Sequence, residues 1–424
     1  MIFTSRSAAM QTISLKEKLD ELKRLRRLGQ WQAAEAVCEE LLHEQVPPLD
    51  SPSISEESLN SALAVLRERA CLYEQSSTNN RLWLESLQLI QALEKRACAP
   101  VSQQARTLWK AHLCAKRMDY VAYHLQGEPH LHEALALFKD PSLLTDPTYL
   151  NLLGWHTAFR AGDLNRGVAL MESALERYSQ IKEERSEDMC FTYQLLSLAY
   201  DQNGCGDKLR LFLERGRALA QAMKEPAELA DLLTFAAARQ AVEPEFALDG
   251  LKWIEKNYGE RHPKLLVLRT AIAGRLEAEA MDEAETYWLE SLSKADEPPM
   301  GHAIYALTGY GGYLERQSRL SEAEDTYNRA MDIIESYFKP EPLFFIGPQP
   351  ALALAELLGN QGRLEESAEL LRNFIARQEK DDYISALDVE YALETLINVL
   401  HRLGRSHETE ALMRKLNKMQ GTES

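Results

Sequence analysis

The sequence predicts an all-α protein built as a series of antiparallel helix hairpins, and three observations support this prediction. Apolar residues recur at intervals of three and four along most of the chain, as on the buried face of an amphipathic helix. No segment shows the sustained alternation of apolar and polar residues that is typical of a half-buried strand. Short windows with a common pattern also recur along the sequence, which is typical of repeat architectures.

The composition limits both the fold and the partners. The chain has 424 residues, of which 45% are hydrophobic, but only 20 Gly and 16 Pro, so turns are sparse and a loop-rich β fold is disfavoured. Its 65 acidic and 48 basic residues give a net charge of −17. The basic footprint of a nucleic-acid-binding protein is missing, so no nucleic-acid partner is expected. No apolar run approaches the ~20 residues that a membrane-spanning helix needs, so no membrane span is expected.

Local features suggest a cytoplasmic protein. The 6 cysteines show no C-x-x-C spacing, which predicts reduced, buried thiols. Lys23, Arg24, Arg26 and Arg27 form the one basic cluster, interpreted as the solvated face of a first helix. Residues 1–13 lack an apolar stretch of secretory length and are expected to form a flexible tail, with an organelle-targeting signal as the alternative.

The apolar periodicity and the turn residues define the expected helices in order. Leu15, Leu19, Leu22 and Leu25 lie on one face of the first helix, and Gly29 separates it from the second. The expected pairs are 14–28 with 31–45, 56–75 with 80–97, 101–126 with 130–139, 145–160 with 164–182, 187–203 with 206–223, 226–240 with 244–258, 262–279 with 281–294, 300–317 with 321–337, 348–361 with 364–379, and 383–403 with 406–420.

Two segments interrupt this pattern. Residues 46–55 are expected to form a loop after the first hairpin, and residues 339–350 carry four prolines, which end helices. The apolar residues 343–346 within the second segment are expected to pack under the neighbouring hairpins. A partner site is the alternative, since exposed apolar clusters often mark interaction surfaces.

The second helix of several hairpins carries small and bulky residues at fixed spacing. The triplets are Gly167, Met171 and Ala174; Ala284, Trp288 and Ser291; and Ala323, Tyr327 and Ala330. We expect the small side chains to let the two helices of a hairpin approach closely, and the bulky side chain to fill the space between hairpins.

This pattern resembles the tetratricopeptide repeat (TPR) family from about Leu15 to Leu416, with turn glycines at Gly29, Gly162, Gly362 and Gly404. The Leu-Gly of helix A and the closing proline of the family are mostly missing, and the unit is longer than the ~34 residues of that family. The resemblance implies a right-handed superhelical α-solenoid of about ten hairpins; a HEAT-type or other solenoid is the alternative. Residues 14–97 would form N-terminal hairpins, residues 98–420 the TPR-like array, and residues 421–424 a disordered end.

No catalytic or cofactor motif emerges from the sequence. Gly309, Gly311 and Gly312 superficially resemble a phosphate-binding loop, but they fall inside an expected helix and lack a following Lys-Ser/Thr, so they are interpreted as packing positions. His130 and His132, close to His124, are two residues apart and do not share a helix face, so no metal site is expected. The sequence therefore predicts a protein without catalytic residues, metal or cofactor.

The TPR resemblance implies a binding groove lined by the first helix of each hairpin. Tyr and Asn suit peptide recognition, because Tyr offers a large contact area and Asn pairs with peptide groups. The candidate groove residues are Tyr123, His156, Arg160, Gln194, Tyr305, Glu315, Glu356, Asn360, Tyr391, Glu394, Asn398 and Arg402. No Asn follows a Lys or Arg by four residues, which disfavours the carboxylate clamp of TPR chaperone adaptors.

The predicted function is a non-enzymatic scaffold or adaptor that binds a peptide or protein segment in the concave groove. Because Glu356 and Glu394 make the last two hairpins acidic, the segment is expected to be neutral or basic. The alternative is a TPR-type regulatory receptor that senses a small peptide or ligand and changes conformation.

Overall fold

A computed structural model describes residues 14–46, 55–76, 80–118, 128–138, 141–181, 186–260, 262–279, 283–293, 300–337, 350–378 and 386–419. Within these ranges all regular structure is helical. Tyr123, His124, the apolar residues 343–346 and the expected terminal tails lie outside them.

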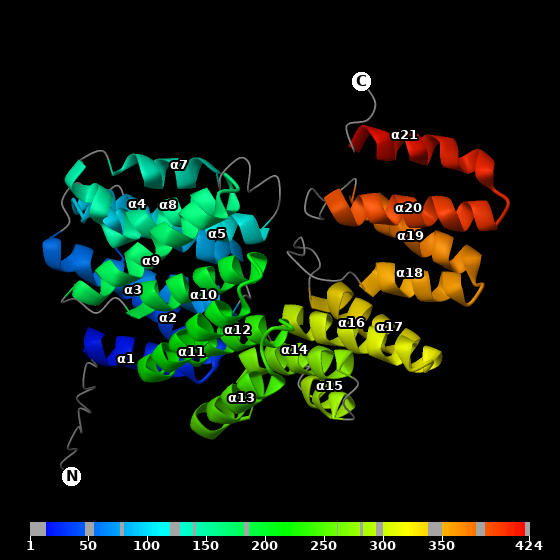
Figure 1. Ribbon diagram of the computed structural model, residues 1–424, viewed down its shortest axis with the longest axis horizontal. Coiled ribbons are helices and arrows are strands. Elements are labelled where there is room, and N and C mark those ends of the chain that lie inside the picture. Colours follow the sequence, from blue (N-terminus) through cyan, green and yellow to red (C-terminus); the bar gives the residue numbers. More distant parts are fainter. Residues whose placement is uncertain are drawn as a thin grey trace, which may run out of the picture.

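The helices follow one another as antiparallel pairs (Figure 1). The pairs are α1 (Leu15–Arg27) with α2 (Trp31–Gln45), α3 (Glu56–Ser76) with α4 (Asn80–Arg96), α5 (Val101–Met118) with α7 (Glu128–Ala136), α8 (Pro147–Phe159) with α9 (Leu164–Gln180), α10 (Ser186–Gln202) with α11 (Gly206–Met223), α12 (Pro226–Ala237) with α13 (Pro244–Tyr258), α14 (Lys264–Ala278) with α15 (Ala284–Leu292), α16 (Met300–Arg316) with α17 (Leu320–Tyr337), α18 (Pro350–Asn360) with α19 (Leu364–Gln378), and α20 (Ala386–Arg402) with α21 (Thr409–Met419). Short 3₁₀ turns precede α8 and α21, at Pro141–Thr145 and Ser406–Glu408. The all-α prediction and the order of the pairs are confirmed.

Successive hairpins stack on one another as in a solenoid. The first helix of a hairpin contacts the first helix of the next, as α12 does α14, α14 does α16 and α16 does α18. Each second helix also contacts the first helix of the following hairpin, as α17 does α18 and α19 does α20. From α12 to α20 the first helices thus form a continuous layer, and the array runs from the blue end of Figure 1 to the red end.

Local sequence sets the helix ends. Ser14 and Glu17 form a reciprocal capping box at the start of α1. Asp146 accepts a hydrogen bond from the Thr148 N–H, and Pro147 occupies the first position of α8. The predicted turn glycines have positive φ, for example +76° at Gly162, a conformation that side chains with a Cβ rarely adopt.

The small residues lie at close helix contacts, as predicted. In the α8–α9 hairpin, a Cβ on Gly167 would lie 2.5 Å from Ala158 Cβ, and a Cβ on Gly154 would lie 2.9 Å from the Gly167 carbonyl. Ala284 and Ala323 are 3% and 0% exposed, which confirms the repeat register in these two hairpins.

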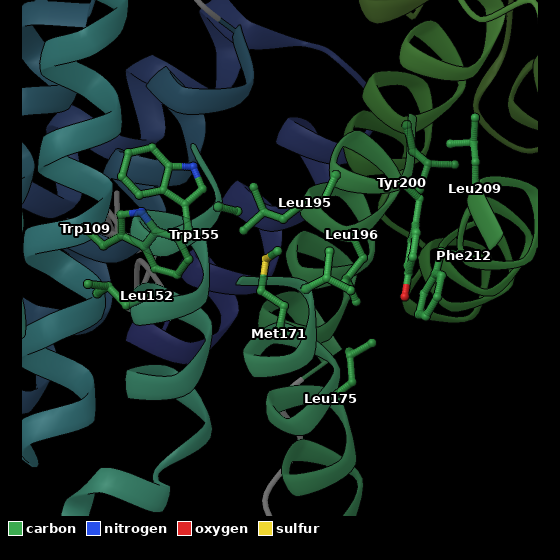
Figure 2. Packing of buried hydrophobic residues seen from close by; sticks show 14 of the residues in the cluster. Trp109, Leu152, Trp155, Met171, Leu175, Leu195, Leu196, Tyr200, Leu209 and Phe212 are labelled. Carbon is green, nitrogen blue, oxygen red and sulfur yellow. The ribbon is translucent and has the colours of Figure 1, made fainter. Parts of the chain in front are cut away.

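The core is a string of apolar clusters shared between adjacent hairpins. The largest joins α5, α7, α8, α9, α10, α11 and α12, and Figure 2 shows some of its side chains. Trp109 and Trp155 lie next to each other at its α5–α8 end, and Tyr200 stacks on Phe212 at its α10–α11 end, with ring centroids 5.3 Å apart. Such shared clusters stabilise each hairpin through its neighbours.

The basic cluster of α1 is not simply a solvated helix face, which corrects that prediction. Arg26 is 4% exposed, and its Nη1 lies 3.2 Å from Oε2 of Glu225, the residue before α12. Arg27 Nη2 lies 2.8 Å from the other oxygen of Glu225. The end of the first helix therefore meets the turn between α11 and α12, in the middle of the array (Figure 1).

The prediction of uniformly buried thiols is also wrong in part. Cys38 and Cys190 are buried, but Cys98 and Cys205 are exposed. Both exposed thiols stand beside turns between helices, where the packing that buries a small apolar side chain is missing.

No helix within the described ranges is both long and apolar enough to cross a bilayer.

Candidate interaction surface

The structure describes eleven of the twelve candidate groove residues, since Tyr123 lies outside the described ranges. The half-buried ones are His156, Gln194 and Glu315, and the exposed ones are Arg160, Tyr305, Glu356, Asn360, Tyr391, Glu394, Asn398 and Arg402. All belong to, or directly follow, the first helix of their hairpin.

One contact brings together candidates from the last two hairpins. Tyr391 on α20 donates a hydrogen bond from its hydroxyl to Glu356 on α18. This bond is the main reason that the pKa of Tyr391 rises to about 12, and the nearby charge of Glu394 adds to the effect. Tyr391 is 44% exposed, so part of this residue is open to solvent close to two carboxylates. We call Glu356, Tyr391 and Glu394 the C-terminal patch.

A third carboxylate, that of Glu315, lies near this patch. Glu315 on α16 accepts a hydrogen bond from the hydroxyl of the buried Tyr327 on α17. Burial, the bond to Glu315 and the charge of Glu356 all raise the pKa of Tyr327. Glu315 thus contributes to the internal packing of its own hairpin.

Arg402 contributes to the joint between hairpins. Its Nη2 donates a hydrogen bond of 2.9 Å to the carbonyl of Gly359, near the C-terminus of α18. A cation near the last carbonyls of a helix is favourable because those carbonyls carry partial negative charge. Arg402 therefore stabilises the C-terminus of α18.

The candidates from the central hairpins form a separate group of opposite charge. His156 and Arg160 lie on α8 and at its end, near His132 of α7. Burial first, and then the positive charges of His132 and Arg160, lower the pKa of His156. Gln194 lies on α10, and within the described ranges its buried Nε2 makes no hydrogen bond. The twelve candidates therefore do not form one uniform acidic groove.

A repeated arginine, which the sequence analysis missed, links the hairpins. Arg363, in the α18–α19 turn, pairs with Glu366 at 2.6 Å and with Glu324 of α17 at 2.6 Å. Arg405, in the turn between α20 and α21, pairs with Glu408 at 2.5 Å and with Glu365 of α19 at 3.0 Å.

Arg319 makes the same two contacts one hairpin earlier, with Glu322 and with Glu285 of α15. The signal was available in the sequence as an Arg followed three residues later by a Glu, in the windows RLSE, RLEE and RSHE. We call Arg319, Arg363 and Arg405 the arginine ladder.

The glycine-rich stretch of α16 is a packing feature. A Cβ on Gly309 would lie 2.7 Å from Trp288, and a Cβ on Gly311 would lie 2.4 Å from Tyr327. The two glycines therefore make room for rings of α15 and α17, which confirms their structural interpretation. Elsewhere within the described ranges, no three His, Cys, Asp or Glu side chains gather as metal ligands.

Comparison with known proteins gives matches only at the level of structure. No protein-family model and no curated protein matches the sequence.

Two solved structures are similar to this chain over nearly its whole length. A Rap protein complexed with competence and sporulation factor is 14% identical, with 96% of this chain and 98% of that chain covered and a TM-score of 0.43. The apo form of the quorum sensor NprR from B. thuringiensis is 12% identical, with coverage of 96% and 98% and a TM-score of 0.45.

A third similar structure is a signal-transduction ATPase with a tetratricopeptide repeat sensor from Pyrococcus horikoshii. It is 11% identical, with 97% of this chain and 72% of that chain covered and a TM-score of 0.42.

The classification rests on the packing of this chain itself. Antiparallel hairpins follow one another, glycines with positive φ lie in the turns, and small residues of the second helix contact the first. These features together make the chain an α-solenoid of antiparallel helix hairpins.

Proposed function

We propose that this protein is a non-enzymatic interaction scaffold that binds a basic peptide or protein segment at the C-terminal patch. The observation that carries the proposal is the contact of Tyr391 with Glu356 across two hairpins, with Glu394 nearby. A Lys or Arg side chain would pair with the carboxylates and lie against the exposed ring, an arrangement that favours cations through both charge and the ring quadrupole.

The surrounding structure supports a binding role for these side chains. Arg319, Arg363 and Arg405 pair with glutamates at the turns and on the second helices, on α15, α17, α19 and before α21. Glu356 and Glu394 lie instead on the first helices, whose continuous layer gives a solenoid an extended binding surface. A partner there would add charge pairs without disturbing the arginine ladder.

The test uses a panel of fluorescent peptides of equal length that carry increasing numbers of Lys and Arg. Anisotropy measures binding to the full chain at about 50 mM and about 300 mM salt, because screening weakens exposed charge pairs. We expect affinity to rise with peptide charge and to fall with salt. The double variant Glu356→Gln with Glu394→Gln should bind these peptides more weakly.

The matched control is Glu369→Gln with Glu410→Gln. Both residues are exposed on second helices, so the control makes the same change in net charge at another surface. Equal losses in the two double variants would mean that only overall charge matters. No loss in the first would place the interaction elsewhere, first on the tyrosines of the central hairpins.

The second candidate is a regulatory receptor that changes conformation when it binds a small peptide. The buried ion pair between Arg26 and Glu225 favours it, because a charged contact between distant parts of the chain is a joint that can separate. A peptide from the same panel that raises the melting temperature and changes the radius of gyration would support this function. A peptide that binds without changing the radius would support the scaffold.

A further inference from the structure

The first hairpin meets the middle of the array at a small interface with unusual composition. We call it the seam. It consists of Arg26, Arg27, Gly29 and Trp31 on one side and Glu225, His262 and Pro263 on the other. It joins residues 199 positions apart, so the first hairpin contacts the segments that precede α12 and α14.

Charged groups at the seam are buried. Arg26 and Glu225 are 4% and 6% exposed, and Arg26 Nε also lies 3.5 Å from Glu68 Oε2 of α3. Burying such a pair costs much of the energy that its attraction returns, so it stabilises an interface less than apolar packing does. The ion pairs therefore contribute less to the stability of the seam than apolar packing in the same place would.

The turn of the first hairpin fits tightly against the loop before α14. Gly29 has a φ of +69°, and a Cβ at this position would lie 2.2 Å from Pro263 Cδ. The ring of Trp31 meets the ring of His262 edge to face, with centroids 6.0 Å apart and an interplanar angle of 77°. The fit leaves no room for a side chain at Gly29.

Two polar atoms in this contact are buried without a partner. Within the described ranges, neither Trp31 Nε1 nor His262 Nε2 makes a hydrogen bond. Each such group costs free energy when it is removed from water. Opening the seam would restore the solvation of both atoms, which offsets part of the free energy gained by docking.

The surroundings of His262 disfavour a positive charge on its ring. The ring is 2% exposed, and its Nδ1 accepts a hydrogen bond of 3.3 Å from the Lys264 N–H. The Lys264 ammonium on α14 lies near it, offset by Asp231 of α12 at 3.0 Å from that ammonium.

From the first hairpin, the Arg27 carbonyl faces the ring and partly offsets this effect. Arg26 pairs with Glu225 and Glu68, and Arg27 pairs with Glu225. Burial first, and then the Lys264 charge, lower the pKa of His262 to about 4.

We propose that the seam is a pH-sensitive latch, in which a neutral His262 keeps the first hairpin docked on α12–α14 and its protonation releases that hairpin. The direction of the pH effect follows from the difference in the proton affinity of His262 between the docked and the free form. The docked form holds the proton less tightly than a free histidine with a pKa of ~6.5. The contribution of neutral His262 to docking is therefore fully present above pH ~6.5. As the pH falls from there toward 4, the equilibrium constant for docking falls by up to about tenfold per pH unit.

The test is hydrogen–deuterium exchange of the full chain at about pH 7 and about pH 5. Exchange of residues 15–45 and 225–264 is divided by that of residues 386–419, which cancels the intrinsic pH dependence of exchange. For wild type we expect this ratio to rise by up to about 20-fold at the lower pH. His262→Asn, which keeps an acceptor near the Nδ1 position but cannot gain the charge, should leave the ratio unchanged.

The matched control for this variant is His407→Asn, because the side chain of His407 is 80% exposed in the last hairpin. It should keep the full rise of wild type. A wild-type ratio that does not change with pH, or a rise of equal size in His262→Asn, would overturn the latch.

A second pair of variants tests the latch without altering the histidine. Gly29→Ala should open the seam at neutral pH, because the new Cβ meets Pro263. Gly162→Ala is the control, since its φ of +76° imposes similar local strain but nothing lies within 4 Å of the new Cβ. Gly29→Ala should raise the exchange of residues 225–264, whereas Gly162→Ala should not; equal exchange in the two variants would contradict the proposal.

Discussion

Tyr391 donates its hydroxyl hydrogen bond to Glu356, a residue 35 positions earlier in the preceding hairpin. The bond fixes the ring over the joint between α18 and α20 and keeps one carboxylate lone pair occupied. A carboxylate can accept several hydrogen bonds, so Glu356 retains the capacity to pair with an incoming cation. The same contact therefore orients the aromatic ring and leaves charge available for a partner.

Alkaline pH should destabilise the protein through its tyrosines. The bond to Glu356 and burial raise the pKa of Tyr391 to about 12, and burial raises those of Tyr193, Tyr200, Tyr287 and Tyr310. A group that holds its proton more tightly when folded stabilises the fold fully below its unfolded pKa of ~10, and that contribution is lost as the pH rises toward 12.

Urea unfolding at about pH 9 and about pH 11 measures this effect, with a lower midpoint expected at the higher pH. Tyr391→Phe should reduce the difference between the two midpoints. An equal urea midpoint at the two pH values would show that folding does not raise the pKa of these tyrosines.

Two glycine-to-alanine changes should have opposite signs. Gly311→Ala places a Cβ 2.4 Å from Tyr327 and should lower the free energy of unfolding by ~1–3 kcal/mol through overpacking. Gly274→Ala, in α14, meets nothing within 4 Å and should raise it by ~0.5–1 kcal/mol, because alanine is the better helix former. Chemical denaturation of both variants checks the pair. Two changes of the same sign would contradict the packing at α16.

The repeat register can be tested at Ala323. This residue is 0% exposed between the helices of its hairpin, so Ala323→Leu should cost ~1–3 kcal/mol of unfolding free energy. Ala376→Leu on the exposed face of α19 is the control and should shift stability by less than ~0.5 kcal/mol. Thermal unfolding followed by circular dichroism measures both. An unchanged melting temperature in Ala323→Leu would mean that α16 and α17 do not pack at this residue.

The arginine ladder should stabilise the last hairpins in a salt-dependent way. Replacing Arg319, Arg363 and Arg405 together by Gln removes three links between neighbouring hairpins, and the melting temperature should fall at low salt. The deficit should shrink as salt rises, because screening weakens the same links in wild type. Arg210→Gln, which removes an ion pair within α11 alone, is the control and should change the melting temperature less. A fall in melting temperature that stays the same at all salt concentrations would mean that the variant loses side-chain packing and not ion pairs.

Most of the fold follows from local patterns in the sequence. Apolar spacing located the helices, and small residues such as Gly167 and Ala323 set the register, because neighbouring helices in a repeat array contact each other at short sequence separation. Ends were less exact where capping signals are weak: α15 begins at Ala284, after a Glu283 that makes no side-chain cap, and not at residue 281 as predicted.

Contacts across long separations could not be predicted. Arg26 has the sequence surroundings of a solvated residue, and only the curvature of the array brings it to Glu225. The candidate site was predicted in part, since Glu356 and Tyr391 meet, while His156 and Arg160 form a group with His132. One-dimensional periodicity shows which residues lie on a helix face but not how that face curves relative to distant hairpins.

The seam also has a consequence for the order in which the protein is made. Arg26 leaves the ribosome 199 residues before Glu225, which is a delay of ~10–40 s at ordinary rates of translation. The early hairpins contact their sequence neighbours and can form during that time, but Trp31 and Arg26 stay uncovered until α12 and the loop before α14 have emerged. The nascent chain therefore presents an indole and a guanidinium that the mature protein hides, and both are available to a chaperone during synthesis.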